Sequence, residues 1–556
     1  MIHSLKLKFG KAPNLPAESV QTTPVTVFVG PNNSGKSKVL AEIHRFCTTG
    51  NVNRSDVIID KIEFEPSRPE VAEDKIRQVM LRPNLGESVL PEQVIVGKRG
   101  HRVQVNKQEL SNSLLDPNGH TPRFCQWYLT YNTLILDGKS RINLINQQGA
   151  GDLQQHPQTS FQVLFRDDTK RKEVRRIIHD AFSSFFVIDP TLLGQFRIRL
   201  SKRRPTVDSE ERGIHEEAVK FHSEALSIDQ SSDGVKAFTG IITEVIAGDP
   251  TILLIDEPEA FLHPSLAFNL GKEIALASTG SEKRLFVSTH SPNFVMGCIQ
   301  SGAPVNIVRL TYRDNLATAR VLPSADILRL MRNPLLRSTG VLSGLFYEFV
   351  VVTESDADRA FYQEINERLL RYKPEFGIPN CLFINAQNKQ TVQIIIKPLR
   401  ELGIPALGIV DIDILKEGGS VWSSFLDSGF VPLIEHQPLG SLRSAVKQKF
   451  DASGKDMKRE GGVDILSAPD KEAANNLFNQ LAEYGLFVVR NGELESWLRN
   501  LSATGHGPAW LIDIFQKMGD DPDSPTFLKP STADVWSFTH ELKKWLVNPN
   551  RKGIPS

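Results

Sequence analysis

Residues 30–37 read Gly30-Pro31-Asn32-Asn33-Ser34-Gly35-Lys36-Ser37, which fits the phosphate-binding loop pattern G-x-x-x-x-G-K-[ST]. The apolar run 25–29 before the loop predicts a strand, and residues 37–43 predict a helix whose N-terminus meets the phosphate. In such a loop the glycines let backbone N–H groups face the β-phosphate, the lysine reaches the β- and γ-phosphates, and the serine hydroxyl is offered to Mg²⁺. The expected nucleotide-binding residues are Gly30, Asn32, Asn33, Ser34, Gly35, Lys36 and Ser37.

Composition excludes several classes of protein. The chain has 556 residues, the length of about three to four domains, and a formal net charge of zero, so any nucleic-acid surface has to be local. Its four cysteines stand alone, which predicts neither a zinc site nor a disulfide framework. No run of about 18 apolar residues occurs, and we expect a cytoplasmic protein without a membrane partner.

The chain is expected to form two α/β domains, residues 1–335 and 344–556, with a boundary near residues 332–334 and a helical extension at the C-terminal end. Residues 51–150 hold short apolar runs between polar turns, which predict mainly strands. Residues 151–222 predict a helical insertion rich in Lys and Arg. A solvated surface explains these basic clusters better than a patch for phosphate backbones.

Two strands downstream of the phosphate loop are expected to end in reactive side chains. The run 251–255 is uniformly apolar, as in a strand buried on both faces of a parallel sheet, and Asp256 and Glu257 follow at its carboxyl end. We expect Asp256 to hold Mg²⁺ and Glu257 to polarise the attacking water. The run 285–289 leads to His290, which we expect beside the γ-phosphate.

A serine–glycine turn precedes the acidic strand. Ser232-Asp233-Gly234 stands before residues 235–245, whose pattern predicts an amphipathic helix. Such a turn can bind an anion at the helix N-terminus, and an ordinary helix cap explains the same residues equally well.

The order of these four features resembles the ABC-type ATPase heads, including those of SMC-like DNA repair proteins, over residues 1–330. The resemblance implies mixed β-sheets and ATP as the ligand. It also implies that Ser232 and Gly234 act on the nucleotide of another subunit, in a homodimer or larger homo-oligomer. Asp233 departs from the LSGGQ form of transporters and favours the soluble branch.

Two further positions are implied by the same resemblance. A glutamine-loop residue is expected between the phosphate loop and the serine–glycine turn, and Gln147 and Gln148 are alternatives for it. His263 follows the acidic strand at a spacing common in this branch, and a packing role explains it at least as well.

Acidic residues also end two strands predicted in the second domain. Glu354 and Asp358 follow the apolar run 349–353, and the run 406–413 ends in Asp411 and Asp413. Alternate residues of an extended chain share a face, so Asp411 and Asp413 are expected to point at one metal ion. Carboxylates that converge without basic neighbours repel, and a hard divalent cation such as Mg²⁺ or Mn²⁺ makes them tolerable. Solvated loop charges are the alternative.

The second domain resembles TOPRIM, the Rossmann-like parallel-sheet module of topoisomerases, primases and some nucleases that acts on phosphodiesters with metal ions. The resemblance gives Glu354, Asp411 and Asp413 catalytic and metal-binding roles. It adds Asp358 and Glu495 as metal ligands of the nuclease branch and Lys529 as the basic residue near the scissile phosphate. Ser355 stands where the family has glycine after the glutamate.

An ABC-type ATPase fused to a C-terminal TOPRIM domain resembles the OLD (overcoming lysogenisation defect) family of nucleases over nearly the whole chain. The resemblance implies an ATP-binding, Mg²⁺- or Mn²⁺-dependent endonuclease whose ATPase domain controls assembly or activity. It implies DNA as the substrate, a role in bacterial anti-phage defence, and a defence protein or retron RNA or DNA as a further partner. Two alternatives stay open: an ATPase scaffold that controls a partner effector, and a ribonuclease that acts on transfer RNA.

Overall fold

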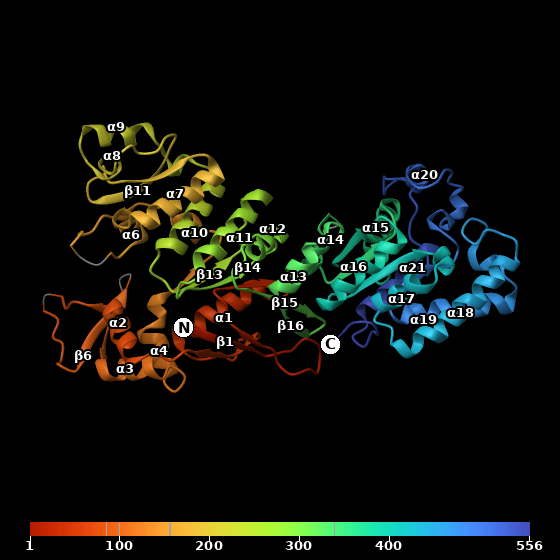
Figure 1. Ribbon diagram of the computed structural model, residues 1–556, viewed down its shortest axis with the longest axis horizontal. Coiled ribbons are helices and arrows are strands. Elements are labelled where there is room, and N and C mark those ends of the chain that lie inside the picture. Colours follow the sequence, from red (N-terminus) through yellow and green to blue (C-terminus); the bar gives the residue numbers. More distant parts are fainter. Residues whose placement is uncertain (85, 99–100, 155–156, 339, 556) are drawn as a thin grey trace. The chain divides into compact units, whose positions relative to one another are not determined.

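The computed structural model describes residues 1–84, 86–98, 101–154, 157–338 and 340–555. The chain forms two compact units (Figure 1), one of Met1–Val29 and Asn33–Leu328 and one of Arg329–Ser556 with Gly30–Asn32. The boundary lies inside helix α13 (Ser324–Met331), a few residues before the position expected from the sequence.

A six-stranded sheet in the first unit includes the strand that leads into the phosphate loop. Its order is β16-β15-β3-β14-β13-β8, and all neighbours are parallel except β15 and β16. The strands are β3 (Val25–Val29), β8 (Thr133–Leu136), β13 (Ile252–Asp256), β14 (Arg284–Ser288), β15 (Val305–Arg313) and β16 (Leu316–Pro323). Because β3, β14 and β13 are adjacent and parallel, their carboxyl ends bring the phosphate loop, His290 and Asp256 to one edge.

Helices pack against this sheet in the first unit (Figure 1). They include α1 (Lys36–Thr49), α10 (Asp233–Ala247), α11 (Pro264–Ser278) and α12 (Pro292–Gln300). Helices α11 and α12 approach closely because Gly271 and Gly297 have no side chains, and a Cβ at either position would overlap a backbone carbonyl oxygen of the other helix.

Residues 51–150 contain more helix than their sequence predicts. Strands β4 (Ile59–Phe64), β6 (Gln93–Lys98) and β7 (His101–Asn106) alternate with helices α2 (Pro69–Val79), α3 (Lys107–Leu115) and α4 (Thr121–Trp127). Strand β4 pairs with β1 (Ile2–Leu7), whose other neighbour is β2 (Ser19–Gln21). The expectation of mainly strands is wrong because Ala72, Ile76 and Val79 recur at helical spacing and are buried, behind a proline at the first helical position.

The basic insertion is only partly helical. Helices α6 (Ser160–Arg166), α7 (Asp168–Phe182), α8 (Asp208–Arg212) and α9 (Glu216–Glu224) accompany the antiparallel strands β10 (Phe185–Asp189) and β11 (Gln195–Ser201).

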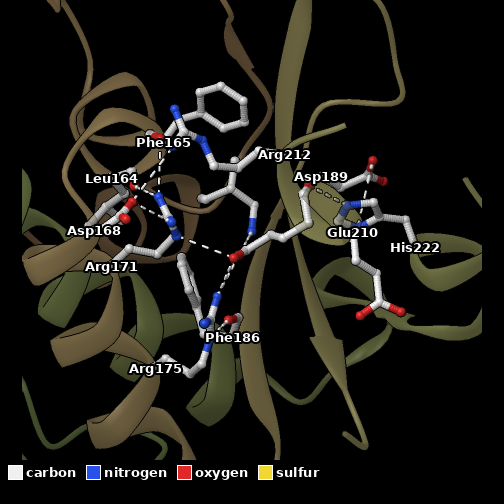
Figure 2. A network of polar contacts seen from close by, with 12 residues as sticks. Leu164, Phe165, Asp168, Arg171, Arg175, Phe186, Asp189, Glu210, Arg212 and His222 are labelled. Carbon is white, nitrogen blue, oxygen red and sulfur yellow. Dashed lines mark hydrogen bonds and ion pairs between the residues drawn. The ribbon is translucent and has the colours of Figure 1, made fainter. Parts of the chain in front are cut away.

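Several arginines of the insertion form internal ion pairs. Figure 2 shows Arg171 beside Asp168, and Arg171 Nη2 donates to Asp168 Oδ1 at 2.6 Å. Arg175 Nη2 lies 2.6 Å from Glu211 Oε1, and Arg171 Nε lies 3.2 Å from Glu211 Oε2. Neither a solvated surface nor a phosphate-binding patch describes Arg171 and Glu211, because both are buried.

The second unit is built on a four-stranded, fully parallel sheet. Its order is β18-β17-β19-β20, with β17 (Phe349–Thr353), β18 (Cys381–Asn385), β19 (Ala406–Asp411) and β20 (Leu486–Val489). Helices α15 (Asp356–Tyr372) and α16 (Lys389–Glu401) connect the strands β17, β18 and β19 in turn. The α/β class predicted from the sequence is confirmed in both units.

Further helices extend the second unit. Helices α17 (Gly419–Ser428), α18 (Leu433–Ala452) and α19 (Ala468–Glu483) lie between β19 and β20 in the chain, and α20 (Pro508–Met518) and α21 (Asp534–Val547) follow β20. The buried Arg400 ties the end of the chain to the sheet, because its guanidinium donates to the carbonyl oxygens of Ala406 and Gly553. Among the described helices, none is both long and apolar enough to cross a membrane.

Candidate functional site

The phosphate loop has the backbone that its glycines predict. Gly35, with a φ of 94°, takes the left-handed conformation that favours glycine, and Asn33 has a φ of 62°. The Lys36 side chain is buried, and burial lowers the pKa of Lys36 to about 8, against the opposing pull of Glu257 and Asp256. The buried Ser34 hydroxyl makes no hydrogen bond within the described residues. A buried cation and an unsatisfied hydroxyl fit a bound phosphate.

The two residues predicted to hold Mg²⁺ are in contact. Ser37 Oγ donates to Asp256 Oδ1 at 2.9 Å, and Ser288 Oγ at the end of β14 donates to the same carboxylate oxygen. A hydroxyl and a carboxylate at this separation form the oxygen donor set that Mg²⁺ prefers. The residues therefore fit the cation that the sequence predicts.

A buried arginine that sequence reasoning missed supports the acidic turn. Arg141 lies in α5 (Ser140–Asn143) and is 1% exposed. Its Nη1 donates to the carbonyl oxygen of Asp256 at 2.6 Å and to that of Glu257. Glu257 has a φ of 49°, a left-handed conformation that costs a non-glycine residue roughly 1–3 kcal/mol. Arg141 therefore helps to hold a strained turn.

His290 lies beside the predicted catalytic glutamate. His290 Nε2 is 3.6 Å from Glu257 Oε1, and the backbone N–H of His290 donates to Glu259 Oε1 at 2.8 Å. Burial lowers the pKa of His290, and Lys36 lowers it further, so the imidazole is neutral at neutral pH. Glu257, His290 and Lys36 are thus brought together as predicted, while their chemical roles stay predictions.

The serine–glycine turn begins α10, with Ser232 at the N-cap and its side chain making no capping hydrogen bond. Ser232 is exposed and Gly234 is buried, and a Cβ at Gly234 would lie 2.6 Å from the carbonyl oxygen of Phe261. Gly234 therefore allows α10 to pack on the loop after β13. The action of Ser232 and Gly234 on the nucleotide of another subunit stays a prediction.

Two positions left open by the sequence are placed as follows. His263 caps α11, because its Nδ1 accepts from the N–H of Ser265 at 3.5 Å and lies 3.1 Å from the Ser265 hydroxyl. The Gln148 side chain accepts from the N–H of Phe161 at 3.3 Å, whereas Gln147 is exposed. The choice between Gln147 and Gln148 stays open.

Three carboxylates converge at the carboxyl ends of β17 and β19 in the second unit. One oxygen from each of Glu354, Asp411 and Asp413 lies within 4.8 Å of the other two. Glu354 Oε1 accepts from the N–H of Asp411 at 2.8 Å, which joins the two adjacent strand ends. Burial, with mutual repulsion, raises the pKa of Glu354 to about 8, and burial raises that of Asp411 to about 7.

Asp413 reaches this cluster in a different way from the one its spacing predicts. Strand β19 ends at Asp411, and Asp413 lies in the 3₁₀ helix η4 (Ile412–Lys416). The argument from alternate residues of a strand is therefore wrong, and a tight turn brings Asp413 back toward Asp411. Asp413 Oδ1 is buried and has no hydrogen-bond partner in the described part of the chain.

Two lysines contact the carboxylates, contrary to the expectation that the acids lack basic neighbours. Lys458 Nζ is 2.8 Å from Asp411 Oδ2 and 3.7 Å from Glu493 Oε2, and Lys389 Nζ is 3.1 Å from Asp413 Oδ2. Although burial opposes it, the pull of Asp411 raises the pKa of Lys458, which stays charged. Lys529, by contrast, has its ammonium 5.8 Å from the centre of the Tyr372 ring. Lys458 and Lys389 are thus the lysines at the acids. Both were missed because no motif marks them.

A second acidic group lies after β20. Single ligand atoms of Glu493, Glu495 and His506 lie within 4.8 Å of one another, and His506 Nδ1 is 2.7 Å from Glu495 Oε1. The predicted ligand Asp358 caps α15, because its Oδ2 accepts from the N–H of Ser355 at 2.9 Å and from the Ser355 hydroxyl at 2.6 Å. Burial, together with repulsion from Glu495, raises the pKa of Asp358. Ser355, the departure from glycine, thus forms a helix cap.

Comparisons with known proteins match parts of the chain. The family model described as "AAA domain, putative AbiEii toxin, Type IV TA system" matches residues 158–296. The Old nuclease of Escherichia phage P2 is 24% identical over 262 residues, which cover 44% of this chain and 43% of that protein. The match therefore spans less than half the length of this relative. Together the two matches confirm the predicted resemblance to an OLD nuclease with an ATPase domain, and the TOPRIM assignment stays a prediction.

Solved structures with detectable similarity include three heads of SMC proteins. An Smc head bound to the C-terminal winged-helix domain of ScpA has a TM-score of 0.34 and 15% identity, and the match covers 59% of this chain and 99% of that one. The SMC head domain from Thermotoga maritima has a TM-score of 0.28 and 14% identity, with 58% and 98% covered. An Smc head derived from Pyrococcus furiosus has a TM-score of 0.31 and 14% identity, with 60% and 99% covered.

Proposed function

We propose that the protein is an ATP-binding, metal-dependent endonuclease of the OLD type that cleaves DNA in anti-phage defence, with the ATPase unit controlling assembly or activity. The observation that carries the proposal is the convergence of Glu354, Asp411 and Asp413, whose oxygens lie within 4.8 Å of one another at two adjacent parallel strand ends. Similarity to the Old nuclease of phage P2 supports the choice of phosphodiester hydrolysis.

The chemistry of this donor set fits a divalent cation. Three half-buried carboxylates repel at neutral pH unless they share protons or bind a cation, and the raised pKa values of Glu354 and Asp411 report this repulsion together with burial. The unpartnered Asp413 Oδ1 offers a free oxygen ligand. When bound, Mg²⁺ or Mn²⁺ supplies Lewis acidity and neutralises charge that develops on the phosphate.

Other residues of the second unit have supporting roles in the proposal. In this proposal Lys458, which lies beside Asp411, contacts the phosphate and takes the role first expected of Lys529. Glu495, with Glu493 and His506, offers a second group of ligand atoms for a second cation, and Asp358 orders the start of α15.

The first unit would bind ATP through the phosphate loop. Lys36 binds the phosphates, Ser37 and Asp256 hold Mg²⁺, and Glu257 orients the attacking water next to His290. Ser232 and Gly234 complete the nucleotide site of a second copy, so that ATP favours a homodimer or larger homo-oligomer. Nucleotide binding alone can shift such an equilibrium, and slow hydrolysis is compatible with a regulatory role.

Cleavage assays test the proposal. Purified protein is incubated with plasmid, single-stranded DNA and transfer RNA, with Mg²⁺, Mn²⁺ or EDTA, and with or without ATP. We expect cleavage of DNA that requires the cation and is lost in the Asp411→Asn, Asp413→Asn double variant. The matched control is Asp427→Asn, an exposed aspartate of α17 whose side chain is 48% exposed.

The outcomes separate the proposal from its alternatives. Cleavage of transfer RNA alone would change the substrate to RNA, because a site that attacks phosphate does not by itself read the sugar. Absence of cleavage under every condition would favour an ATPase scaffold that controls a partner effector. Equal cleavage by the wild type and the double variant would remove the three carboxylates from the reaction.

A further inference from the structure

A polar hollow lies between helices α17 and α18 of the second unit, outside the carboxylate cluster. Its volume is about 630 Å³, and its walls include Trp422 of α17 and Gln437, Gly440, Ser441 and Arg443 of α18. None of the described residues that line it is acidic. Its polar groups are chiefly hydrogen-bond donors, hydroxyls and amides, so the hollow favours an acceptor-rich or anionic ligand.

Two N–H donors at this hollow have no acceptor. Trp422 is 4% exposed, and its indole Nε1 is buried without a hydrogen-bond partner in the described residues. A Cβ built at Gly440 would lie 3.9 Å from this nitrogen, so the indole nitrogen is a near neighbour of Gly440, and both residues line the hollow. Arg443 Nε is likewise buried and has no hydrogen-bond acceptor among the residues that the structure describes. A buried donor without an acceptor costs roughly 1–3 kcal/mol, which a ligand acceptor would recover.

Arg443 also forms no salt bridge among the described residues. Its Nη1 donates to the carbonyl oxygens of Leu415 at 2.8 Å and Glu417 at 2.6 Å, and its Nη2 donates to the Ser444 hydroxyl at 2.9 Å. Among the described residues, no carboxylate oxygen lies within the 4.0 Å of a salt bridge to this guanidinium. Arginine is well suited to phosphate because its planar fork offers several N–H groups at once.

Arg443 also links the hollow to the carboxylate cluster. The carbonyl oxygens that it binds belong to η4 and the residue after it, and η4 carries Asp413. Lys389 joins the same segment from the other side, because its Nζ lies 3.1 Å from both Asp413 and Glu417 carboxylate oxygens. A ligand in the hollow would therefore contact the arginine that fixes the turn presenting Asp413.

We propose that this hollow binds a phosphate group of the nucleic-acid strand, next to but separate from the phosphate that is cleaved. Trp422 Nε1–H, Arg443 and the hydroxyl of Ser441 are the groups that recognise it. The inference rests on the proposed nuclease function and deepens it, since a second phosphate contact fixes the register of the strand at the carboxylates. Free phosphate has the same chemistry, and the test separates the two sources.

Binding of a fluorescein-labelled single-stranded oligonucleotide, followed by anisotropy in EDTA and without nucleotide, tests the proposal apart from cleavage. Arg443→Gln is expected to weaken binding about tenfold and to lower the slope of log K against log salt by about 0.7, the value for one phosphate contact on a single strand. Lys447→Gln, whose lysine pairs with Asp451 at 2.6 Å, is the control and is expected to leave affinity and slope unchanged.

A second pair of variants guards against a merely structural effect of Arg443. Trp422→Phe keeps an aromatic ring in place and removes the N–H, and Gly440→Ala adds a methyl group 3.9 Å from that nitrogen in a helix that tolerates alanine. Each is expected to weaken oligonucleotide binding about threefold or more, as the loss of a single hydrogen bond of about 0.7 kcal/mol does. The fold is checked by circular dichroism.

The outcomes distinguish this inference from the proposed function. If Arg443→Gln and Trp422→Phe bind the oligonucleotide like the wild type with an unchanged salt slope, or if the wild type binds none, the phosphate site is refuted. If these variants bind the oligonucleotide normally and still cleave, the proposed nuclease function holds and the phosphate site in the hollow is refuted. Inorganic phosphate, matched in concentration to the oligonucleotide phosphates at constant ionic strength, is expected not to compete. Displacement by inorganic phosphate would refute the nucleic-acid source.

Discussion

Replacement of Arg141 by methionine is expected to impair ATP hydrolysis without removing ATP binding. The guanidinium donates to the carbonyl oxygens of Asp256 and Glu257 and has no role in the predicted contacts with the nucleotide. Methionine fills a similar volume and removes the donor. Glu257, held at a φ of 49°, would then relax out of its left-handed conformation and carry its carboxylate away from His290.

The size of the effect follows from the hydrogen bonds that are lost. A hydrogen bond from a charged group contributes about 1.5–3 kcal/mol, and each 1.36 kcal/mol changes a rate tenfold. If about one such bond is lost from the positioning of Glu257 in the transition state, kcat falls roughly 10- to 150-fold. KM for ATP should change little, because Lys36 and Ser37 are untouched.

Steady-state ATP hydrolysis, together with binding of a fluorescent ATP analogue, measures both quantities. Arg176→Met is the matched control, since Arg176 is 43% exposed on α7 and forms surface ion pairs with Glu173 and Asp180. Arg141→Lys should restore only part of the rate, because an ammonium cannot copy the geometry of the guanidinium. If folded Arg141→Met protein hydrolyses ATP as fast as the wild type, Arg141 does not position Glu257.

Three further predictions concern other parts of the molecule. In EDTA the pKa values of Glu354 (about 8) and Asp411 (about 7) exceed their unfolded values, so the folded state binds more protons than the unfolded state. The melting temperature should therefore fall as the pH rises from about 4 to about 8, and Mg²⁺ should restore it. A melting temperature that does not change with pH would contradict this. Gly234→Ala places a Cβ 2.6 Å from a carbonyl oxygen and should destabilise the first unit by about 1–3 kcal/mol, as measured by urea unfolding. It should also reduce ATP-dependent dimerisation, as measured by light scattering. Unchanged stability and assembly would show that the loop adapts. Lys458→Gln should lower DNA cleavage at least about tenfold while the exposed Lys529→Gln stays near wild type, and the reverse order would restore the first assignment.

The sequence predicts which residues of the expected nucleotide site lie together, because these residues follow strand ends. The loop 30–37, Asp256 and His290 each follow an apolar run, and adjacent parallel strands bring their carboxyl ends to one edge. The contact between Ser37 and Asp256 follows from this rule alone, although 219 residues separate the two in the chain. The same rule predicts the meeting of Glu354, which follows β17, with Asp411 at the end of β19.

Side chains that join these sites from elsewhere could not be predicted. Arg141 and Lys458 contact the acidic turns from segments without a recognisable motif, and their partners are far away in the chain. The place of Asp413 in a 3₁₀ helix also escapes prediction, because an Asp-x-Asp pair looks the same in a strand and in a turn. Local spacing therefore identifies the acids, and only the folded chain shows what neutralises them.

Runs of charged residues also limit what can be predicted from the sequence. The basic insertion looks like a surface patch, yet Arg171 and Glu211 are both buried and paired. Arg171 lies on α7 and Glu211 on α8, so the composition of the segment cannot show that these two residues neutralise each other. In such a pair each charge neutralises the other, so Arg171 offers no free charge to a polyanion.

Binding of Mn²⁺ to nucleotide-free protein, measured by electron paramagnetic resonance, tests the central claim that the carboxylates at β17 and β19 form a metal site. The account predicts that the wild type, Lys36→Ala and Asp427→Asn proteins bind Mn²⁺ alike, and that Asp411→Asn, Asp413→Asn protein binds fewer ions at the same free concentration. Equal Mn²⁺ binding by the wild type and the double variant would contradict it.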